Sequence, residues 1–315
     1  MANRFLASLF YPLIHTGYGC EFGLLGQLAK GLADTAVTSL LAPAVTPQTL
    51  MKYAGVVVTN TVSATVSRLT SLFPSFVTGQ VQRAVQPTSP KTASKCVHVL
   101  TLMSRLMHNN HFSHQNIKLP RPVQSEDNTS LKHILHLCSA ELTEIVEEWT
   151  VNGMNAAEVP AKIKEIFWTS VILFGIVGWG ARKTSRTGTF NTDFFLVHLV
   201  TSSLFLPLIV AYISPTSTTI LLCTYLLNTL VLYVAHGSLA LPIADFFNVA
   251  VTPALPAASL LHNTPADRTL MADNCMPSAW LAITQSTLEH PDDHLCKLQR
   301  SLAHFDLLYG ILVRY

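Results

Sequence analysis

The stretch FFLVHLVTSSLFLPLIVAYI, residues 194 to 213, decides which folds this chain can adopt. Similar apolar runs precede and follow it, IFWTSVILFGIVGWGA at residues 166 to 181 and TILLCTYLLNTLVLYVA at residues 219 to 235. None of these runs alternates apolar with polar residues, as a half-buried strand would. We therefore expect a mainly α fold whose central apolar helices lie either in a buried core or in a membrane.

Polar residues inside the runs favour the buried core. Residues 194 to 213 have about the length that crosses a bilayer, but they include His198, Pro207 and several hydroxyl side chains. The run that follows is short for a membrane span and contains Asn228. Polar groups are expensive in a helix that faces lipid and fit better in a helix that lines a cavity. The sequence thus predicts no stable membrane insertion, and a small multi-span membrane protein is the alternative.

Composition narrows the class of protein further. Hydrophobic residues make up 49% of the 315 residues and charged residues 12%, which allows a large buried core. The formal net charge is +2 without a long basic run, so we expect no nucleic-acid partner. Six scattered cysteines without CxxC spacing indicate reduced thiols in a cytoplasmic protein. The apolar N-terminus lacks the small-residue cleavage site of a secretory signal.

The remaining sequence predicts one compact multi-helix domain over residues 1 to 315. Apolar spacing predicts further helices at residues 21 to 42, 48 to 72 and 131 to 149, and a helical pattern over 280 to 315. Proline occurs in all three segments that we expect to be loops, near residues 85 to 95, 108 to 128 and 251 to 279, and the second is also rich in histidine and asparagine.

Three histidine-bearing segments are candidates for chemistry: YPLIHTGYG at 11 to 19, DFFLVHLVTSS at 193 to 203 and HPDDHLCK at 290 to 297. In the third, Pro291 suits the first position of a helix, and aspartates suit its positive end. His294 and Lys297 would share a helix face. Imidazoles from separate helices are how helical bundles bind iron. His15, His198, His290 and His294 are therefore candidate metal ligands.

Simpler roles remain open for these residues. A histidine on an apolar helix is more often a hydrogen-bonded core residue, which applies to His198, and His290 and Asp292 could be capping residues. The cluster of His108, His111 and His114 lies in a polar segment, where we expect it to be solvated. The chain shows no facial-triad spacing, no GxGxxG after a strand and no nucleophile elbow.

From about residue 10 to its end, the chain resembles the questin oxidase-like family in these three segments. AKIKEI at 161 to 166 and LPIADFF at 241 to 247 fit the same family. Two departures stand beside the resemblance. The family has a further N-terminal region with a histidine-bearing helix, so we expect a truncated or divergent member. His236-Gly237 occurs where the family pattern leads us to expect Arg-Gly. The polar contact that the arginine would make is therefore not expected in the same form.

The resemblance implies an oxidoreductase of fungal secondary metabolism that uses molecular oxygen to cleave an anthraquinone or related polyketide ring. The reaction would be a Baeyer–Villiger-type insertion or a dioxygenase-type opening, and NADPH is associated with some members. It also implies non-haem iron held by His15, His198, His290 or His294, and Lys297. Lys297 would bind only as a carbamate, because an ammonium has no lone pair. An inactive polyketide-binding member is a further alternative.

The residues expected to be catalytic on this basis are His15, His198, His294 and Lys297. We expect the flat substrate to stack among aromatic side chains of an apolar pocket. The side chains predicted to line it are Trp168, Phe194, Phe195 and Phe205.

Overall fold

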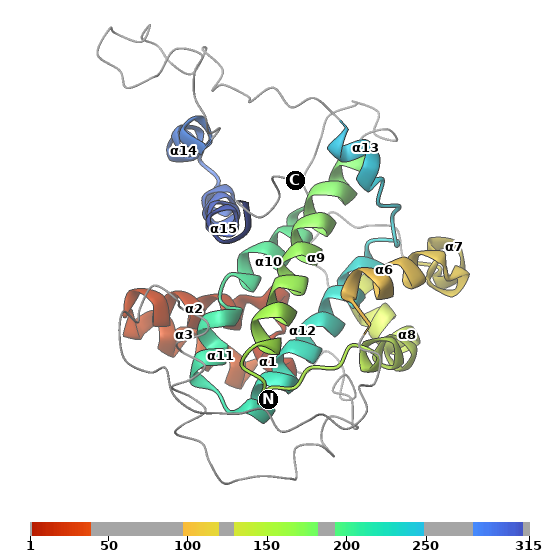
Figure 1. The fold of residues 1–315 in the computed structure, drawn as a ribbon, viewed down its shortest axis with the longest axis horizontal. Coiled ribbons are helices and arrows are strands. Elements are labelled where there is room, and N and C mark those ends of the chain that lie inside the picture. The colour runs from red at the N-terminus through yellow and green to blue at the C-terminus, as the bar shows by residue number, and fades with distance from the viewer. Residues whose placement is uncertain (1, 39–96, 120–128, 182–192, 249–279, 311–315) are drawn as a thin grey trace, which may run out of the picture. The chain divides into compact units, whose positions relative to one another are not determined.

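The computed structural model of the chain describes residues 2–38, 97–119, 129–181, 193–248 and 280–310 (Figure 1). Within these ranges every regular element is helical, which confirms the predicted mainly α fold. The chain forms two compact units, Met1–Leu241 and Pro242–Tyr315. The predicted helix at 48 to 72 and the predicted loops near 85–95 and 251–279 lie outside the described residues.

Unit 1 contains most of the helices. They are α1 (Ala2–Phe5), η1 (Ser8–Phe10), α2 (Tyr11–Phe22), α3 (Leu25–Val37), α6 (Val99–His108), η3 (Asn110–Phe112), α7 (His114–Ile117), α8 (Thr129–Glu147), α9 (Glu158–Ala181), α10 (Phe194–Ser203), α11 (Leu206–Tyr212) and α12 (Pro215–Ala235). The segment predicted as a loop near 108 to 128 thus includes the short helices η3 and α7 in its described part. Unit 2 contains α13 (Ile243–Phe247), α14 (Trp280–Glu289) and α15 (Asp293–Tyr309).

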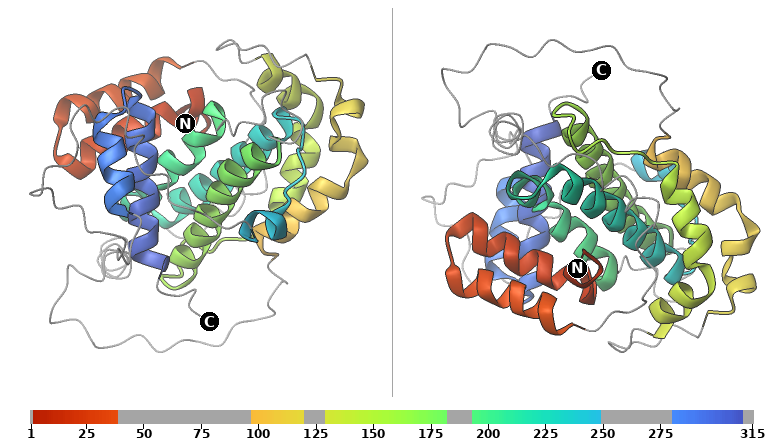
Figure 2. Two further views of the ribbon diagram at one scale, coloured as in Figure 1. Left: turned by 90° about the horizontal axis from the view of Figure 1, so that it is seen from above. Right: turned by 90° about the horizontal axis from the view of Figure 1, so that it is seen from below.

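The central apolar runs form the core of unit 1. α10 packs along α9, and α12 packs against α8 and α9 (Figures 1 and 2). Nearly every residue of α12 from Leu221 to Val234 is buried. Between α10 and α12, the hydroxyl of Tyr225 donates to the Leu199 carbonyl at 2.8 Å and lies 2.7 Å from the Ser202 hydroxyl. Ser202 and Tyr225, polar residues of two different apolar runs, are therefore paired with each other inside the core.

The run from 194 to 213 is two helices rather than one. α10 ends at Ser203, α11 begins at Leu206, and the axes of the two helices are bent by 46°. Pro207 explains the break, since its nitrogen cannot donate a hydrogen bond and its ring clashes with the carbonyl four residues earlier. The hydroxyls of Thr201 and Ser203 bond to carbonyls one turn back, which also bends helices.

Length and composition alone would let some of these helices cross a membrane. Glu158–Gly180 and Pro215–Ala235 both qualify among the described residues, and the bent pair α10 and α11 would be a third if it formed one span. In the most apolar windows of the first two, 61% and 78% of the residues are buried inside the molecule. Protein rather than solvent therefore covers much of their apolar surface.

Helices α2 and α3 form a closely packed hairpin, coloured red in Figure 1. Gly19 and Gly31 make this approach possible. A side chain at Gly31 would overlap the backbone and hydroxyl of Thr16, and one at Gly19 would overlap the backbone of Leu28. Gly23 ends α2 in the left-handed region at φ 65°, which glycine adopts without strain. The hairpin fixes the position of the residues on α2 that face α10.

A buried ion pair ties α9 to its neighbours. Lys162 is 5% exposed, and its ammonium lies 2.9 Å from a carboxylate oxygen of Glu165 and 4.9 Å from the centre of the Trp149 ring. The other Glu165 oxygen accepts from the Trp149 indole at 2.8 Å and from the backbone N–H of Val99 at 3.1 Å. One carboxylate therefore connects the start of α6, the segment after α8 and α9.

In unit 2, α14 and α15 pack side by side (Figure 2), and the indole of Trp280 donates to Asp306 at 2.7 Å. Pro291 does not start a helix as predicted. Asp292 is the N-cap, its carboxylate accepts from the His294 N–H at 2.9 Å, and α15 begins at Asp293. An aspartate caps a helix more effectively than a histidine, because its carboxylate accepts the unpaired N–H of the first turn.

Candidate functional site

His198 and Tyr11 meet in the core of unit 1, one from α10 and one from the start of α2. His198 is 2% exposed, and its Nδ1 lies 2.8 Å from the Phe194 carbonyl oxygen. Because a carbonyl only accepts, Nδ1 carries the hydrogen and Nε2 carries a lone pair. Nε2 lies 3.2 Å from the Tyr11 hydroxyl, which donates to it. In the neutral imidazole, these two contacts define the tautomer that carries its hydrogen on Nδ1.

His15 lies one helical turn after Tyr11 on α2. Its ring stacks on the Tyr11 ring, with centroids 5.9 Å apart and planes inclined by 22°. The Gln27 amide on α3 lies 2.5 Å from Nδ1 of His15 and donates to it. The Tyr11 ring also meets the edge of the His198 ring at 5.1 Å. Tyr11 therefore contacts both of the imidazoles that the sequence singled out in this unit.

A strained turn places Tyr11 in this position. Ser8, Leu9 and Phe10 have φ of 50°, 56° and 64°, the left-handed region that disfavours side chains by about 1–2 kcal/mol per residue. The buried Phe10 ring packs 4.9 Å from the Tyr225 ring, which helps to hold the turn. Strain of this kind persists where packing over-determines it and is frequent at functional sites. Sequence reasoning missed Tyr11, although its spacing of four from His15 puts both on one helix face.

A hollow of about 370 Å³ opens beside Tyr11 and His15. Its wall is formed by the turn before α2, by α2 and by α3. The lining residues are Ser8, Tyr11, Pro12, His15, Lys30, Asp34 and Thr38. A second hollow, of about 320 Å³, lies between η3 and α8 and is lined by three glutamates and His111. His108 and His111 are exposed, as the solvated interpretation of that cluster expects.

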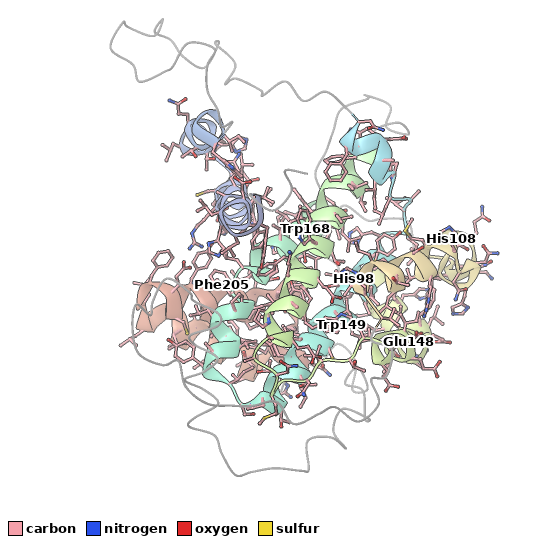
Figure 3. All side chains as sticks on the ribbon, in the orientation of Figure 1. His98, His108, Glu148, Trp149, Trp168 and Phe205 are labelled. Carbon is pink, nitrogen blue, oxygen red and sulfur yellow. The ribbon has the colours of Figure 1, made fainter. Side chains whose placement is uncertain are left out.

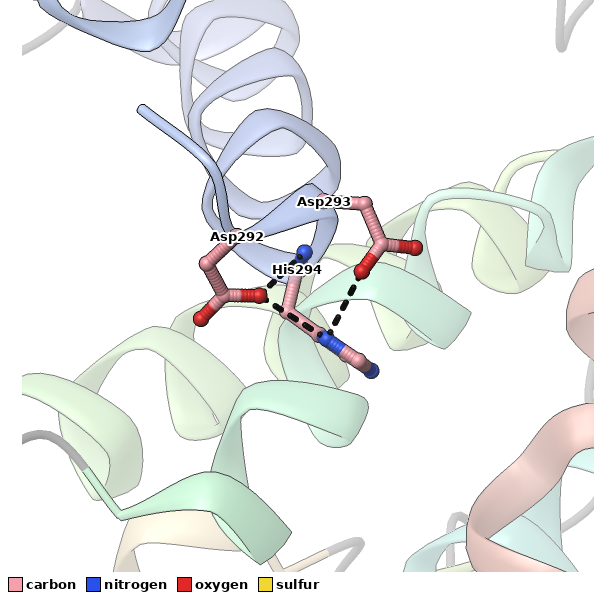
Figure 4. A group of neighbouring side chains, drawn as sticks. All are labelled: Asp292, Asp293 and His294. Atoms are coloured by element: carbon pink, nitrogen blue, oxygen red, sulfur yellow. Dashed lines mark hydrogen bonds and ion pairs between the residues drawn. The ribbon is translucent and has the colours of Figure 1, made fainter. Parts of the chain in front are cut away.

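His294, one of the predicted residues of unit 2, forms a polar cluster with Asp292 and Asp293 at the start of α15 (Figure 4). Nδ1 of His294 lies 3.1 Å from Asp292 and 3.2 Å from Asp293, and the Lys297 ammonium bonds to Asp293 at 2.6 Å. Among the described residues, Asp292, Asp293 and His294 form the one group of three whose ligand atoms could meet at a metal ion. Exposed acidic groups often lie together without a metal, so proximity here is weak support for a site.

Hydrogen bonds lower the pKa values of both carboxyls in this cluster. The backbone N–H and the ring of His294 stabilise ionised Asp292, and the Lys297 ammonium stabilises ionised Asp293. Nδ1 of His290 accepts from the Asp292 N–H at 3.1 Å. His294 and Lys297 share one helix face as predicted, since both bond to Asp293. Lys297 acts there as an ammonium donor.

The predicted aromatic substrate pocket does not form around Phe205. This side chain is 1% exposed and fills the space that Gly17 leaves on α2, beside the Tyr18 ring. Trp168 lies on α9 and Phe205 between α10 and α11 (Figure 3). Neither hollow given above is lined by Trp168, Phe194, Phe195 or Phe205. Phe205 is a packing residue because the glycine opposite it admits its whole ring.

His236 keeps a polar contact at the position where the family pattern leads us to expect arginine. It ends α12, and its Nε2 lies 3.3 Å from a carboxylate oxygen of Asp193. Asp193 is the N-cap of α10 and accepts from the N–H groups of Phe195 and Leu196. The His236 ring also lies 5.3 Å from the Phe195 ring. Histidine can therefore hold the start of α10 in place of a longer basic side chain.

Comparison with known proteins identifies the class to which this fold and these histidine segments belong. The sequence pattern of the questin oxidase-like family matches residues 1–302 of the chain. The chain belongs to the questin oxidase-like family, which confirms the resemblance noted in its sequence. The family name indicates an oxidoreductase that acts as an oxidase on a small molecule. A search of curated proteins finds no match.

Proposed function

We propose that this protein uses molecular oxygen to cleave a ring of a planar aromatic polyketide of the anthraquinone type, in fungal secondary metabolism. The observation that carries the proposal is the contact of Tyr11 with both His15 and His198, next to a hollow large enough for a small ligand. Sites of 300 to 1,000 Å³ with a few convergent polar groups are typical of small-molecule enzymes. Membership of an oxidase family supplies the reaction type.

The proposal includes non-haem iron, and the imidazoles of unit 1 fit such an ion chemically. The Phe194 carbonyl holds Nδ1 of His198, as backbone carbonyls do for imidazoles that bind metals through the other nitrogen. His15 and His198 are the ligands that unit 1 would provide. To bind the ion, His198 would have to lose the bond from the Tyr11 hydroxyl to its Nε2, and His15 the bond from the Gln27 amide to its Nδ1. Iron, when bound, would supply the activation of molecular oxygen.

Within unit 2, the residues that we propose as metal ligands are His290, His294 and Lys297. His294 and Lys297 now contact carboxylates, which must release them before they can bind a cation. For Lys297 the ammonium must also lose its proton and take up carbon dioxide to become an oxygen donor. A carbamate would replace the ammonium that stabilises ionised Asp293 by a second anion, so the bound cation would have to balance both charges.

Metal content and oxygen uptake test the proposal together. Protein purified without detergent is reconstituted with ferrous iron and bicarbonate, and iron is measured by elemental analysis. We expect near-stoichiometric iron and oxygen uptake with 1,8-dihydroxyanthraquinone. His15→Ala, His198→Ala, His294→Ala and Lys297→Met should each lower both. His108→Ala, at an exposed histidine on α6, is the matched control and should change neither. Protein that binds the quinone without oxygen uptake would be an inactive binder.

The electron donor separates the two forms of the reaction. A Baeyer–Villiger-type insertion uses one oxygen atom and needs a reductant, whereas a dioxygenase-type opening incorporates both atoms. We therefore propose that oxygen uptake be measured with and without NADPH, and uptake that needs NADPH would identify the first form. Cytoplasmic localisation is part of the proposal, supported by the free thiols of Cys20, Cys138, Cys223 and Cys296. Recovery in a membrane fraction would contradict it.

A further inference from the structure

The hollow beside Tyr11 has two chemically different sides. One part of its lining is aromatic and apolar, with the rings of Tyr11 and His15, which stack on each other with planes inclined by 22°, and with Pro12. The other side is polar and comes from α3 and the turn before α2, with Lys30, Asp34 and the hydroxyls of Ser8 and Thr38. A ligand that fills it should therefore have a flat apolar body and a polar edge.

Lys30 and Asp34 determine which polar groups a ligand in the hollow can carry. They lie one turn apart on α3, with 2.9 Å between the ammonium nitrogen and a carboxylate oxygen. The ammonium can only donate hydrogen bonds and the carboxylate can only accept them. Neighbouring carbonyl and hydroxyl oxygens on a ring system lie about 2.7 Å apart, close to the separation of the two charged atoms. On binding, the hydroxyl turns its hydrogen from the carbonyl to Asp34, and Lys30 replaces it as the donor to the carbonyl. A carbonyl beside a hydroxyl on a planar ring system matches this pair in both spacing and polarity.

Other ligand classes match the hollow less well. A simple anion would meet the Asp34 carboxylate next to the Lys30 ammonium, so one charge would cancel the attraction of the other. A metal cation would find one carboxylate that already has an ammonium partner. A wholly apolar ligand would cover both charged groups without replacing their water contacts, which is costly. The combination of stacked rings with a donor–acceptor pair favours a hydroxylated quinone or a related hydroxy ketone.

We propose that the hollow between the turn at Ser8–Phe10, α2 and α3 binds the oxygenated edge of a planar hydroxyquinone, with Lys30 donating to its carbonyl and Asp34 accepting from its neighbouring hydroxyl. The ring system lies against the aromatic side chains of Tyr11 and His15 that line the hollow. This inference rests on the proposed function for the identity of the ligand as substrate. Lys30 and Asp34 are then specificity-determining residues, and the strained turn serves to set Ser8 and Tyr11 at the edge of the site.

Equilibrium binding under nitrogen tests this site without turnover. The probes are 1,8-dihydroxyanthraquinone and unsubstituted anthraquinone, and their Kd values are measured by quenching of tryptophan fluorescence. We expect the unaltered protein to bind the hydroxylated probe at least tenfold more tightly. Lys30→Met and Asp34→Asn should each raise its Kd about tenfold, as expected for loss of one hydrogen bond to a charged group. The Kd of anthraquinone should hardly change.

Matched controls show whether the effect is local. Lys132→Met removes an exposed lysine of α8 outside the hollow and should leave both Kd values unchanged. Lys30 and Asp34 form an exposed pair, so thermal unfolding of both variants should resemble that of the unaltered protein. Equal binding of the two probes, or Lys30→Met and Asp34→Asn variants that behave like Lys132→Met, would overturn this site.

The outcome also separates this inference from the proposed function. One possible outcome is oxygen uptake with the hydroxylated probe and a Kd that stays the same in Lys30→Met and Asp34→Asn. This outcome would support the proposed function and overturn the proposed binding site. Selective binding that depends on Lys30 and Asp34, without oxygen uptake, would support the site and contradict the function. Failure of the unaltered protein to bind either probe would overturn both.

Discussion

The two groups of candidate residues differ in how much of their chemistry the surrounding protein controls. In unit 1, His198 is almost wholly buried, and protein atoms occupy both ring nitrogens. In unit 2, His294 lies beside Asp292 and Asp293 at the exposed start of α15. Buried polar groups depend on particular partners, whereas exposed ones can exchange theirs for water. We therefore expect changes in unit 1 to alter stability and changes in unit 2 to alter mainly local ionisation.

The largest expected effect is that of Glu165→Ala. The change leaves the buried Lys162 ammonium without its ion-pair partner, which costs about 3–5 kcal/mol of unfolding free energy. Urea unfolding followed by circular dichroism measures this cost. The exposed pair of Arg105 and Glu148 provides the control, and Glu148→Ala should cost less than about 1 kcal/mol. Equal costs at the two positions would show that burial does not decide the outcome.

His198→Ala should destabilise the protein by about 2–4 kcal/mol. It removes a buried side chain from α10 and leaves the Tyr11 hydroxyl and the Phe194 carbonyl without this partner. Urea unfolding measures the loss, and His294→Ala is the matched variant at a half-buried histidine, for which we expect less than about 1 kcal/mol. A larger loss of stability for His294→Ala than for His198→Ala would reverse the comparison.

Tyr11→Phe should cost about 1 kcal/mol, because it removes one buried hydrogen bond and keeps the ring. Its main effect should be on His198, whose Nε2 loses its donor while Nδ1 keeps the Phe194 carbonyl. Nitrogen-15 NMR of the imidazole should show a changed Nε2 shift and an unchanged tautomer. An Nε2 signal identical to that of the unaltered protein would contradict the contact between these two residues.

The smallest expected effect concerns ionisation at the start of α15. The Lys297 ammonium lowers the pKa of Asp293 from its ordinary value of 3.8. Asp293 therefore contributes stability that is present above pH 3.8 and is lost as the pH falls through the lower, folded-state value. Carbon-13 NMR titration of the carboxyl should give a midpoint below 3.8, and Lys297→Met should move it upward. An unmoved midpoint would mean that Lys297 carries no ammonium in solution, as a carbamate would not.

Much of the fold could be predicted because the formation of a helix depends on the local spacing of apolar residues along the sequence. The amphipathic pattern from Leu131 predicted α8, and Ile134, Leu142 and Val146 are buried there as that pattern requires. Boundaries were harder to predict. The break before α11 depends on how Pro207 and the hydroxyl residues before it bond within a packed core, and α15 begins after Asp292 because its carboxylate reaches the His294 N–H.

The sequence by itself determined the helical class, the family and the histidines worth testing, because periodicity and motif order are properties of the chain alone. Only the tertiary structure revealed Tyr11 between His15 and His198, since α2 and α10 are far apart in sequence. It likewise made Phe205 a packing residue opposite Gly17 and joined Lys162 to Trp149 through Glu165. Such contacts arise from the packing of distant helices, and no local pattern in the sequence encodes which side chains will meet.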